Sequence, residues 1–233
     1  MSERPEREAL EVREVAGEQA PPADVQVSTL RLVATLAVAG ALAGLLIVMV
    51  NLHTKPIIDE YKAEQLRLAI YEVLPGVARY RTLYLVDGAL SDSIPEGAKE
   101  SAYRQAYVGY DESGRMQGVA VSRGESGFQD IVQVIFGFEP ESGILLGMKV
   151  LESKETPGLG DKIFKDLDFV GQFFARPQTP LNAIKAGSGK GLPGEIDAIT
   201  GATISSKVVV SVINNGVAEW QPIFEQGIPE EAQ

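Results

Sequence analysis

An uncharged run near the N-terminus constrains this chain more than any other feature. Residues 32–50 read LVATLAVAGALAGLLIVMV, and Thr35 is the only clearly polar residue among them. At about 1.5 Å of rise per residue, a helix of this length comes close to the roughly 30 Å hydrocarbon thickness of a bilayer. We therefore predict one transmembrane helix over residues 29–52.

A cleaved signal peptide is the alternative interpretation of this run. The long, net acidic stretch before it, the length of the run and the absence of a clear small-x-small cleavage site all favour a membrane anchor. Charge bias hardly sets the orientation, because basic residues stand on both sides, and only Arg31 beside the span favours a cytoplasmic N-terminus. Gly40 and Gly44 form a GxxxG pattern, which suits close packing against a partner helix but equally occurs in spans that face only lipid.

The rest of the chain divides by composition into four further parts. Residues 1–28 are rich in Glu, Pro, Ala and Gln, which predicts a disordered acidic tail. Residues 53–76 have near-helical apolar spacing from Pro56 onward and end at Pro75-Gly76, which predicts an amphipathic connecting helix. A folded domain is expected over 77–225, followed by a short C-terminal tail over 226–233.

Within that domain the patterns indicate an α+β fold. Strands are expected at 82–86, 102–110, 116–122, 131–138, 144–151 and 181–185, with hairpin turns at 111–114 and 139–143, and helices at 162–174 and 204–220. The glycine-rich segment 187–194 reads as a connecting loop. It is not a phosphate-binding loop, because no glycine stands at the required upstream spacing and Gly191 replaces the Ser or Thr that would meet Mg²⁺.

Composition excludes several kinds of chemistry. The net charge of −11 argues against a nucleic-acid partner, whose phosphates favour basic surfaces. The chain has no cysteine, which excludes disulfides, iron–sulfur clusters and thiol catalysis, and its single His53 excludes a histidine-rich metal site. We predict no metal site, so any redox work requires an organic cofactor.

The segment Asp197-Ala198-Ile199-Thr200-Gly201-Ala202-Thr203 stands directly before an apolar helical run. Thr203 would lie at or beside the N-cap of that helix, where its hydroxyl can cap a free backbone N–H or instead carry a phosphoryl group favoured by the helix dipole. Gly201 and Ala202 leave room beside the hydroxyl, and Ser205 and Ser206 could donate hydrogen bonds to phosphate oxygens. Asp197 could fix the turn through backbone bonds or help recruit a metal during a modification step.

This segment resembles the flavinylation motif D-x-x-T-G-A-T of the FMN-binding domain family. The matching positions are Asp197, Thr200, Gly201, Ala202 and Thr203. The resemblance implies that FMN is esterified through its phosphate to Thr203. It also implies a separate flavin transferase that uses FAD and Mg²⁺ to attach the FMN.

A second segment, Glu155-Thr156-Pro157-Gly158-Leu159-Gly160, resembles the E-T-P-G-L-G loop of the G subunit of the Rnf electron transport complex. The C subunit of the Na⁺-pumping NADH:quinone oxidoreductase is similar. This chain departs from the family of these subunits at one point: just before Glu155, where the family often has a histidine, it has Ser153 and Lys154. Physically, the proline stiffens the turn and the glycines let backbone approach a flat ring, which Leu159 could cover while Thr156 bonds its polar edge. An ordinary surface turn is the alternative.

Taken together, the resemblances imply a membrane-anchored flavoprotein subunit that relays electrons through a covalent FMN in an Rnf-type ferredoxin/NAD ion-translocating complex, without being an enzyme by itself. Its expected partners are other membrane and peripheral subunits, the flavin transferase and membrane lipid. The expected location is the inner membrane, with a cytoplasmic N-terminus and a periplasmic FMN domain. The alternative is an anchored extracytoplasmic binding or scaffold module without covalent flavin.

Overall fold

The computed structural model describes residues 28–175 and 180–229, and its contacts divide the chain into two units, 1–58 and 59–233. The described part of the first unit is helical. Helix α2 begins at Thr29 and includes the whole uncharged run. The helix is long and apolar enough to cross a membrane, and no part of its most apolar segment is buried. Residues 1–27 of the predicted acidic tail, and residues 230–233 of the predicted C-terminal tail, lie outside the described residues.

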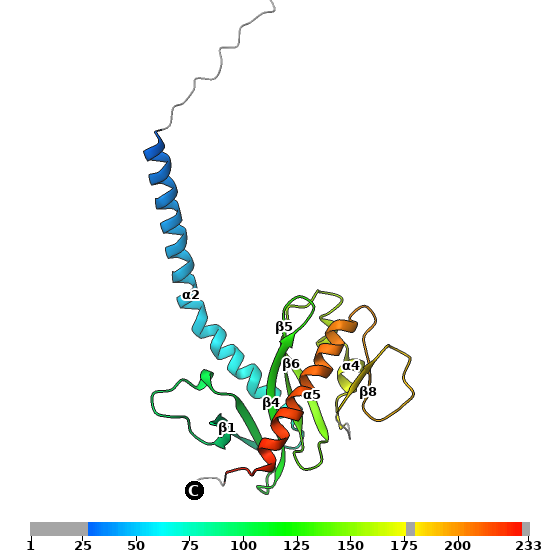
Figure 1. Ribbon diagram of the computed structural model, residues 1–233. Coiled ribbons are helices and arrows are strands. Elements are labelled where there is room, and N and C mark those ends of the chain that lie inside the picture. Colours follow the sequence, from blue (N-terminus) through cyan, green and yellow to red (C-terminus); the bar gives the residue numbers. More distant parts are fainter. Residues whose placement is uncertain (1–27, 176–179, 230–233) are drawn as a thin grey trace, which may run out of the picture. The chain divides into compact units, whose positions relative to one another are not determined.

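Helix α2 continues without interruption to Val73, so the predicted span and the predicted connecting helix form one element, Thr29–Val73 (Figure 1). Pro56 lies inside it. A proline removes one backbone donor and crowds the preceding turn, but it does not end a helix whose flanking residues favour helical structure. The helix ends just before Pro75-Gly76, as the sequence predicts.

The second unit is built on an antiparallel sheet of order β2-β1-β3-β4-β5-β6. Its strands are β1 (Arg79–Val86), β2 (Ala89–Ser91), β3 (Gln105–Tyr110), β4 (Met116–Ser126), β5 (Ile131–Phe138) and β6 (Leu145–Glu152). A short parallel pair, β7 (Asn182–Ile184) and β8 (Glu195–Asp197), stands apart from it. The helical segments are η1 (Glu100–Ala102), α3 (Lys162–Lys165), α4 (Leu167–Gly171) and α5 (Thr203–Glu225). The predicted α+β fold with an N-terminal apolar helix is therefore confirmed.

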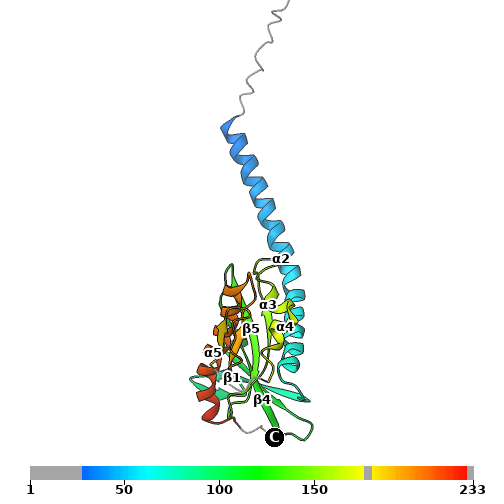
Figure 2. The same cartoon turned by 90° about the vertical axis from the view of Figure 1, so that its right-hand side faces the viewer.

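Helices cover both faces of the sheet (Figure 2). Strand residues point alternately to the two sides. On β5, Val134, Phe136 and Phe138 pack in the cluster that includes α5, whereas Ile135 packs in the cluster with Ile70 and the other last residues of α2. The strands are consequently apolar on both faces, which explains why their sequences read as nearly continuous hydrophobic runs.

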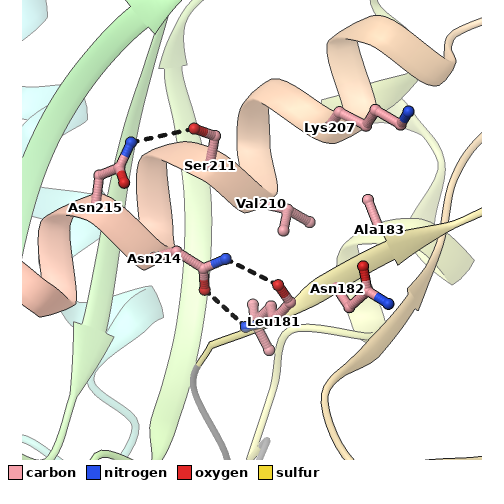
Figure 3. A pocket seen from close by; sticks show the side chains of 8 residues that line it. All are labelled: Leu181, Asn182, Ala183, Lys207, Val210, Ser211, Asn214 and Asn215. Atoms are coloured by element: carbon pink, nitrogen blue, oxygen red, sulfur yellow. Dashed lines mark hydrogen bonds between the residues drawn. The ribbon is translucent and has the colours of Figure 1, made fainter.

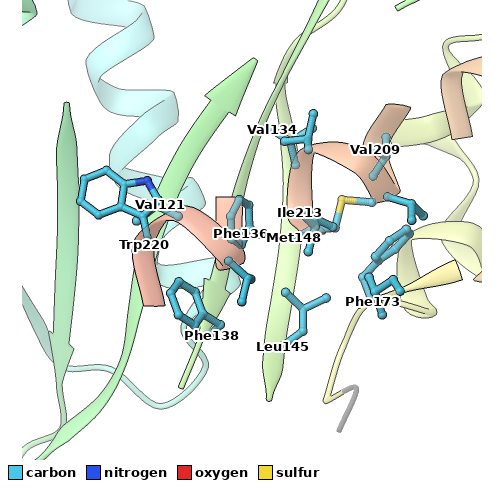
Figure 4. Packing of buried hydrophobic residues seen from close by; sticks show 14 of the residues in the cluster. Val121, Val134, Phe136, Phe138, Leu145, Met148, Phe173, Val209, Ile213 and Trp220 are labelled. Atoms are coloured by element: carbon cyan, nitrogen blue, oxygen red, sulfur yellow. The ribbon is translucent and has the colours of Figure 1, made fainter. Parts of the chain in front are cut away.

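The larger core lies between α5 and the sheet (Figure 4). Large side chains such as Trp220, Phe136, Phe138 and Met148 are almost fully buried there. Each such side chain contributes roughly 1.5–3 kcal/mol by leaving water. This packing fixes α5 along the sheet and therefore fixes where its first turn lies.

Several local features differ from the sequence-based prediction, among them the strand expected over 102–110, which begins at Gln105 after helix η1. The single helix expected over 162–174 is two short helices, because Asp166 adopts an extended conformation (ψ 104°) and caps α4. The short strands β2 and β8 were not predicted from the sequence. Helix α5 extends through Pro222 to Glu225, beyond the expected end at residue 220.

Candidate functional site: a cavity joining two sequence motifs

The two motif segments meet in one cavity of about 370 Å³. Three parts of the chain form it: the turn between β4 and β5, the loop after β6, and the start of α5. The lining residues are Phe128, Glu155, Thr156, Leu159, Gly160, Gly201, Ala202, Thr203, Ile204 and Ser205. All of these except Phe128 and Ile204 were predicted as site residues from the sequence.

Thr203 is the first residue of α5 and is exposed. The N-cap position belongs to Ala202, which makes no side-chain cap bond, so Thr203 does not cap the helix. Among the residues that the structure describes, no hydrogen bond engages the Thr203 hydroxyl. Capping therefore does not account for Thr203, which lies in the lining of the cavity.

The beginning of α5 is also suited to an anion. The first backbone donation into the helix comes from Ser206 N to Ala202 O, so the earlier N–H groups of the first turn have no partner within the helix. These donors and the dipole of a 23-residue helix favour negative charge at this end. A phosphoryl group on Thr203 would lie where the helix stabilises it.

Gly201 brings the two motifs into contact. Its φ of +84° is a left-handed conformation that favours glycine, and a Cβ built there would lie 3.3 Å from Leu159 Cδ2. Leu159 itself remains 48% exposed although it lines the cavity. Its loop is closed by the Thr156 carbonyl, which accepts from the backbone N–H groups of Leu159 and Asp161 at 3.1 and 3.3 Å.

Glu155 is only 5% exposed, and both of its carboxylate oxygens are used inside the protein. Oε2 accepts from Ser205 Oγ at 2.6 Å, and Oε1 accepts from Gln129 N at 3.0 Å. Burial alone would raise the pKa of Glu155, but hydrogen bonds from Ser205 and from the backbone of residues 128–130 outweigh burial and hold the pKa below its ordinary value. Glu155 is therefore an ionised link between three segments.

Ser205 and Ser206, which the sequence suggested as donors to a phosphate, have partners within the protein. A hydroxyl has one proton to donate. Ser205 gives its proton to Glu155, and Ser206, which is fully buried, donates to Ala202 O at 2.9 Å and accepts from Ile199 N at 3.0 Å. Neither hydroxyl is thus free to donate to a phosphate in this arrangement, and both instead fix the start of α5.

Besides the buried Ser206, the predicted residues Gly158, Asp197 and Thr200 lie outside the cavity lining. Asp197 accepts from Gly187 N at 3.2 Å, and its backbone exchanges two hydrogen bonds with the Gln172 side chain. These bonds fit the turn-fixing role that the sequence left open for Asp197.

Sequence reasoning missed two lining residues, Phe128 and Ile204. An aromatic residue directly after Gly127, in a turn between two predicted strands, was a usable signal for Phe128. Ile204 carried no such signal, because an apolar residue at the start of an apolar helical run is most simply a core residue.

A second cavity of about 360 Å³ lies between α5 and β7 (Figure 3). The Asn214 carboxamide pairs with Leu181 on one side of it, accepting from Leu181 N at 2.7 Å and donating to Leu181 O at 2.8 Å. None of the predicted site residues lines this cavity. We interpret its polar wall as the attachment of β7 to α5.

Comparison with known proteins assigns the domain. Residues 127–218 match the FMN-binding domain family, and this range contains every residue that lines the first cavity. The chain is 32% identical over 187 residues to the G subunit of the ion-translocating oxidoreductase complex of Methanosarcina acetivorans, covering 80% of this chain and 92% of the relative. It is 30% identical over 190 residues to the G subunit of the Na(+)-translocating ferredoxin:NAD(+) oxidoreductase complex of Acetobacterium woodii, covering 80% and 88%.

A solved structure shares the fold. The crystal structure of NqrC from Shewanella oneidensis matches with a TM-score of 0.60 at 18% identity, covering 72% of this chain and 98% of that chain. The relatives establish the family, and the cavity lies within the matching domain. The chain belongs to the family of G subunits of ion-translocating oxidoreductase complexes and contains that family's FMN-binding domain.

Proposed function

We propose that this protein is a membrane-anchored flavoprotein subunit that carries FMN as a phosphoester of Thr203 and relays electrons within an Rnf-type ferredoxin/NAD ion-translocating complex. One observation carries the proposal. The exposed Thr203 hydroxyl stands unengaged at the start of a long helix, in the same cavity as the Leu159 loop.

The residues present fit the cofactor. The N-terminal turn of α5 offers unpaired backbone donors to a phosphate, and the apolar side chains of Phe128, Leu159 and Ile204 offer surface to a planar ring. The cavity volume of about 370 Å³ falls within the usual range for cofactor sites. Thr156 is placed in the lining, where its hydroxyl can reach the polar edge of a ring.

Attachment requires a balanced group transfer. We propose that a flavin transferase uses FAD and Mg²⁺: the Thr203 Oγ1–P bond forms, the pyrophosphate bond of FAD breaks, and AMP leaves with the proton of the hydroxyl. Bound FMN supplies one- and two-electron redox chemistry. The chain supplies a fixed tether at Thr203, a helix end that neutralises the phosphate, and apolar side chains that keep water from the ring.

The same proposal covers location and partners. Helix α2 would cross the inner membrane among lipid. Its N-terminus, with the predicted acidic tail, would lie in the cytoplasm, which Arg31 favours, and the domain over 77–225 would face the periplasm. A covalent tether suits that side, where a lost flavin could not be replaced from the cytoplasm. The names of the relatives support other members of a complex as electron partners.

Mass spectrometry of the chain purified from its native membrane tests the proposal. We expect the mass of one FMN less one water on the peptide that contains Thr203, with fragmentation placing it on Thr203 rather than on Thr200, Ser205 or Ser206. The Thr203→Val variant should fold and lack covalent flavin, because it keeps the shape of the side chain without the nucleophile. A folded variant that still carries flavin covalently would contradict the assignment.

Wild-type protein that stays unmodified in cells containing the transferase would instead support an anchored binding or scaffold module. In that case the cavity would hold a free ligand or a partner segment. Thermal unfolding of Thr203→Val beside the wild type controls for loss of structure.

A further inference from the structure

Phe128 is an unusual member of the cavity lining because it is 65% exposed. It lies in the turn of residues 127–130, between β4 and β5, and its ring has no aromatic partner among the described residues. Leu159 and Ile204 line the same cavity and are 48% and 53% exposed. Three large apolar side chains from three separate segments therefore leave apolar surface in water around one cavity, which indicates a ligand with a large apolar face.

The turn that carries Phe128 is attached to the rest of the domain through Glu155. Gln129 N donates to Glu155 Oε1 at 3.0 Å, and Gly127 N donates to Asp130 O at 2.8 Å across the turn. A Cβ at Gly127 would lie 2.4 Å from Glu155 Oε1, so the turn sits directly on the carboxylate. The ion pair of Lys154 and Asp130, at 2.8 Å, adds a second and more exposed attachment.

The other oxygen of Glu155 reaches the first turn of α5. It accepts from Ser205 Oγ at 2.6 Å, two residues after Thr203. One buried carboxylate thus connects the segment that carries Phe128 to the segment that carries Thr203. Because both oxygens are bonded to the protein, the position of the carboxylate is fixed.

We propose that Phe128 forms a wall that covers one part of a flat aromatic ring system tethered at Thr203, and that Glu155 is the positioning residue that holds this wall in place. The proposal rests on the proposed function, because the tether supplies the ring. An aromatic side chain stacks on a planar heterocycle or meets its edge, and either contact would bury the apolar area that Phe128 now exposes. This positioning role adds to the cofactor-binding role that the resemblance implies for Glu155.

Access of a quencher to flavin fluorescence tests the wall. Acrylamide is the suitable quencher, because the net charge of −11 would repel iodide. In full-length protein, Phe128→Ala should raise the quenching constant roughly two- to fivefold, since one wall of the site is lost. Phe164→Ala is the matched control: Phe164 is also an exposed phenylalanine, at 42%, but it lies in α3 outside the cavity lining, and its removal should leave quenching unchanged.

The covalent flavin is measured by mass in all three proteins before quenching. Flavin absent from Thr203 in the wild type would overturn the proposed function and this inference with it. Flavin present on Thr203, with the same quenching constant in Phe128→Ala and wild type, would overturn the wall alone and leave the tether intact.

Hydrogen exchange and a double-mutant cycle test the role of Glu155. Glu155→Gln keeps the size of the side chain but loses the charge that attracts the amide donors, so the backbone amides of residues 127–130 should exchange faster in flavin-free protein. In flavinylated protein it should raise acrylamide quenching, yet add nothing in the Phe128→Ala background, because both changes then remove the same wall.

Glu155→Asp provides a second measurement if the glutamine variant does not fold. It keeps the charge but is too short to reach both Ser205 and Gln129, so exchange of the same amides should again be faster. Unchanged exchange in a folded Glu155 variant, or a quenching effect that adds fully to that of Phe128→Ala, would overturn the positioning role.

Discussion

Gly160 lies in close contact with the residues that hold the site together. A Cβ there would lie 2.7 Å from Glu155 Cβ and 2.8 Å from its Oε2, and 3.0 Å from Ser205 Oγ. None of these atoms is the end of a free side chain, because Glu155 is buried and bonded on both oxygens. The glycine is thus required by close approach and not by backbone conformation.

We predict that Gly160→Ala destabilises the domain by about 1–3 kcal/mol, as expected when a methyl group is forced into a packed site. Gly171→Ala is the control: no atom lies within 4 Å of a Cβ there, and alanine favours the helical conformation of α4. Urea unfolding of both variants makes the comparison. Equal midpoints for Gly160→Ala and wild type would show that the loop relaxes around the methyl group.

Tyr107 gives the domain a dependence on alkaline pH. Its side chain is 5% exposed and donates to Gln105 Oε1 at 2.7 Å. Burial, with smaller contributions from Tyr80, Tyr84 and Glu100, raises the pKa of Tyr107 to about 12. A tyrosine in the unfolded chain titrates near 10, so the unfolded state binds fewer protons than the folded state between these two values.

The free energy of unfolding should consequently fall as pH rises from about 10 to about 12, by up to roughly 3 kcal/mol from this one group. Tyr107→Phe removes the titrating hydroxyl, so its loss of stability over the same interval should be smaller than that of the wild type. Unfolding midpoints measured across this pH range check the difference. Parallel curves for the two proteins would contradict the prediction.

At the scale of elements, the break between α3 and α4 shows how one side chain divides a helix. Asp166 has extended backbone, and its Oδ1 accepts from Asp168 N at 3.1 Å and from Phe169 N at 3.2 Å. These bonds satisfy two N–H groups that a helix start leaves open. Phe169, in this helix, and Phe173, just after it, are buried in the larger core.

Asp166→Ala should cost about 0.5–2 kcal/mol of stability, which is typical for the loss of an N-cap side chain. Asp168→Ala removes an exposed carboxylate from the first turn of the same helix, where only its attraction to the helix dipole is lost, and should cost less. Thermal unfolding of the two variants separates the cap from the charge. A cost for Asp168→Ala as large as that for Asp166→Ala would contradict the capping role.

At the scale of the whole molecule, the last turns of α2 belong to the folded domain. Ala69, Ile70, Val73 and Leu74 are buried against the sheet face that carries Tyr107, Ala120 and Ile135. Two ion pairs, Lys62–Glu152 and Lys149–Glu72, add to this contact. The compact unit accordingly begins at Asp59 and not at the end of the helix.

We predict that a chain starting at Asp59 is soluble and folds cooperatively, whereas a chain starting at Val77 aggregates. Removing Ile70, Val73 and Leu74 forfeits roughly 1.5–3 kcal/mol each, a sum comparable with the whole stability of a small domain. It also exposes one face of the sheet. Size-exclusion chromatography and circular dichroism compare the two chains, and equal behaviour would show that α2 is dispensable for folding.

The sequence by itself determined the features that are local or periodic. Residues 32–50 were predicted as a helix because an uncharged run of that length suits a membrane span, and the structure has them in α2. Strand β5 was predicted with its observed bounds because its apolar run is closed by turn residues. Thr203 and the Glu155–Gly160 loop, which line one cavity, could be singled out from the sequence because each belongs to a motif of consecutive residues.

Only the tertiary structure decided how those residues are used. Burial places Ser205 and Ser206 among acceptors that no spacing in the sequence identifies, and it gives Glu155 partners from segments far apart along the chain. Phe128 lines the cavity because the turn between β4 and β5 lies beside the start of α5. The register of the sheet and the packing of the helix together determine this position. The sequence identifies Thr203 as the candidate hydroxyl, whereas the packing of distant segments forms the cavity that it lines.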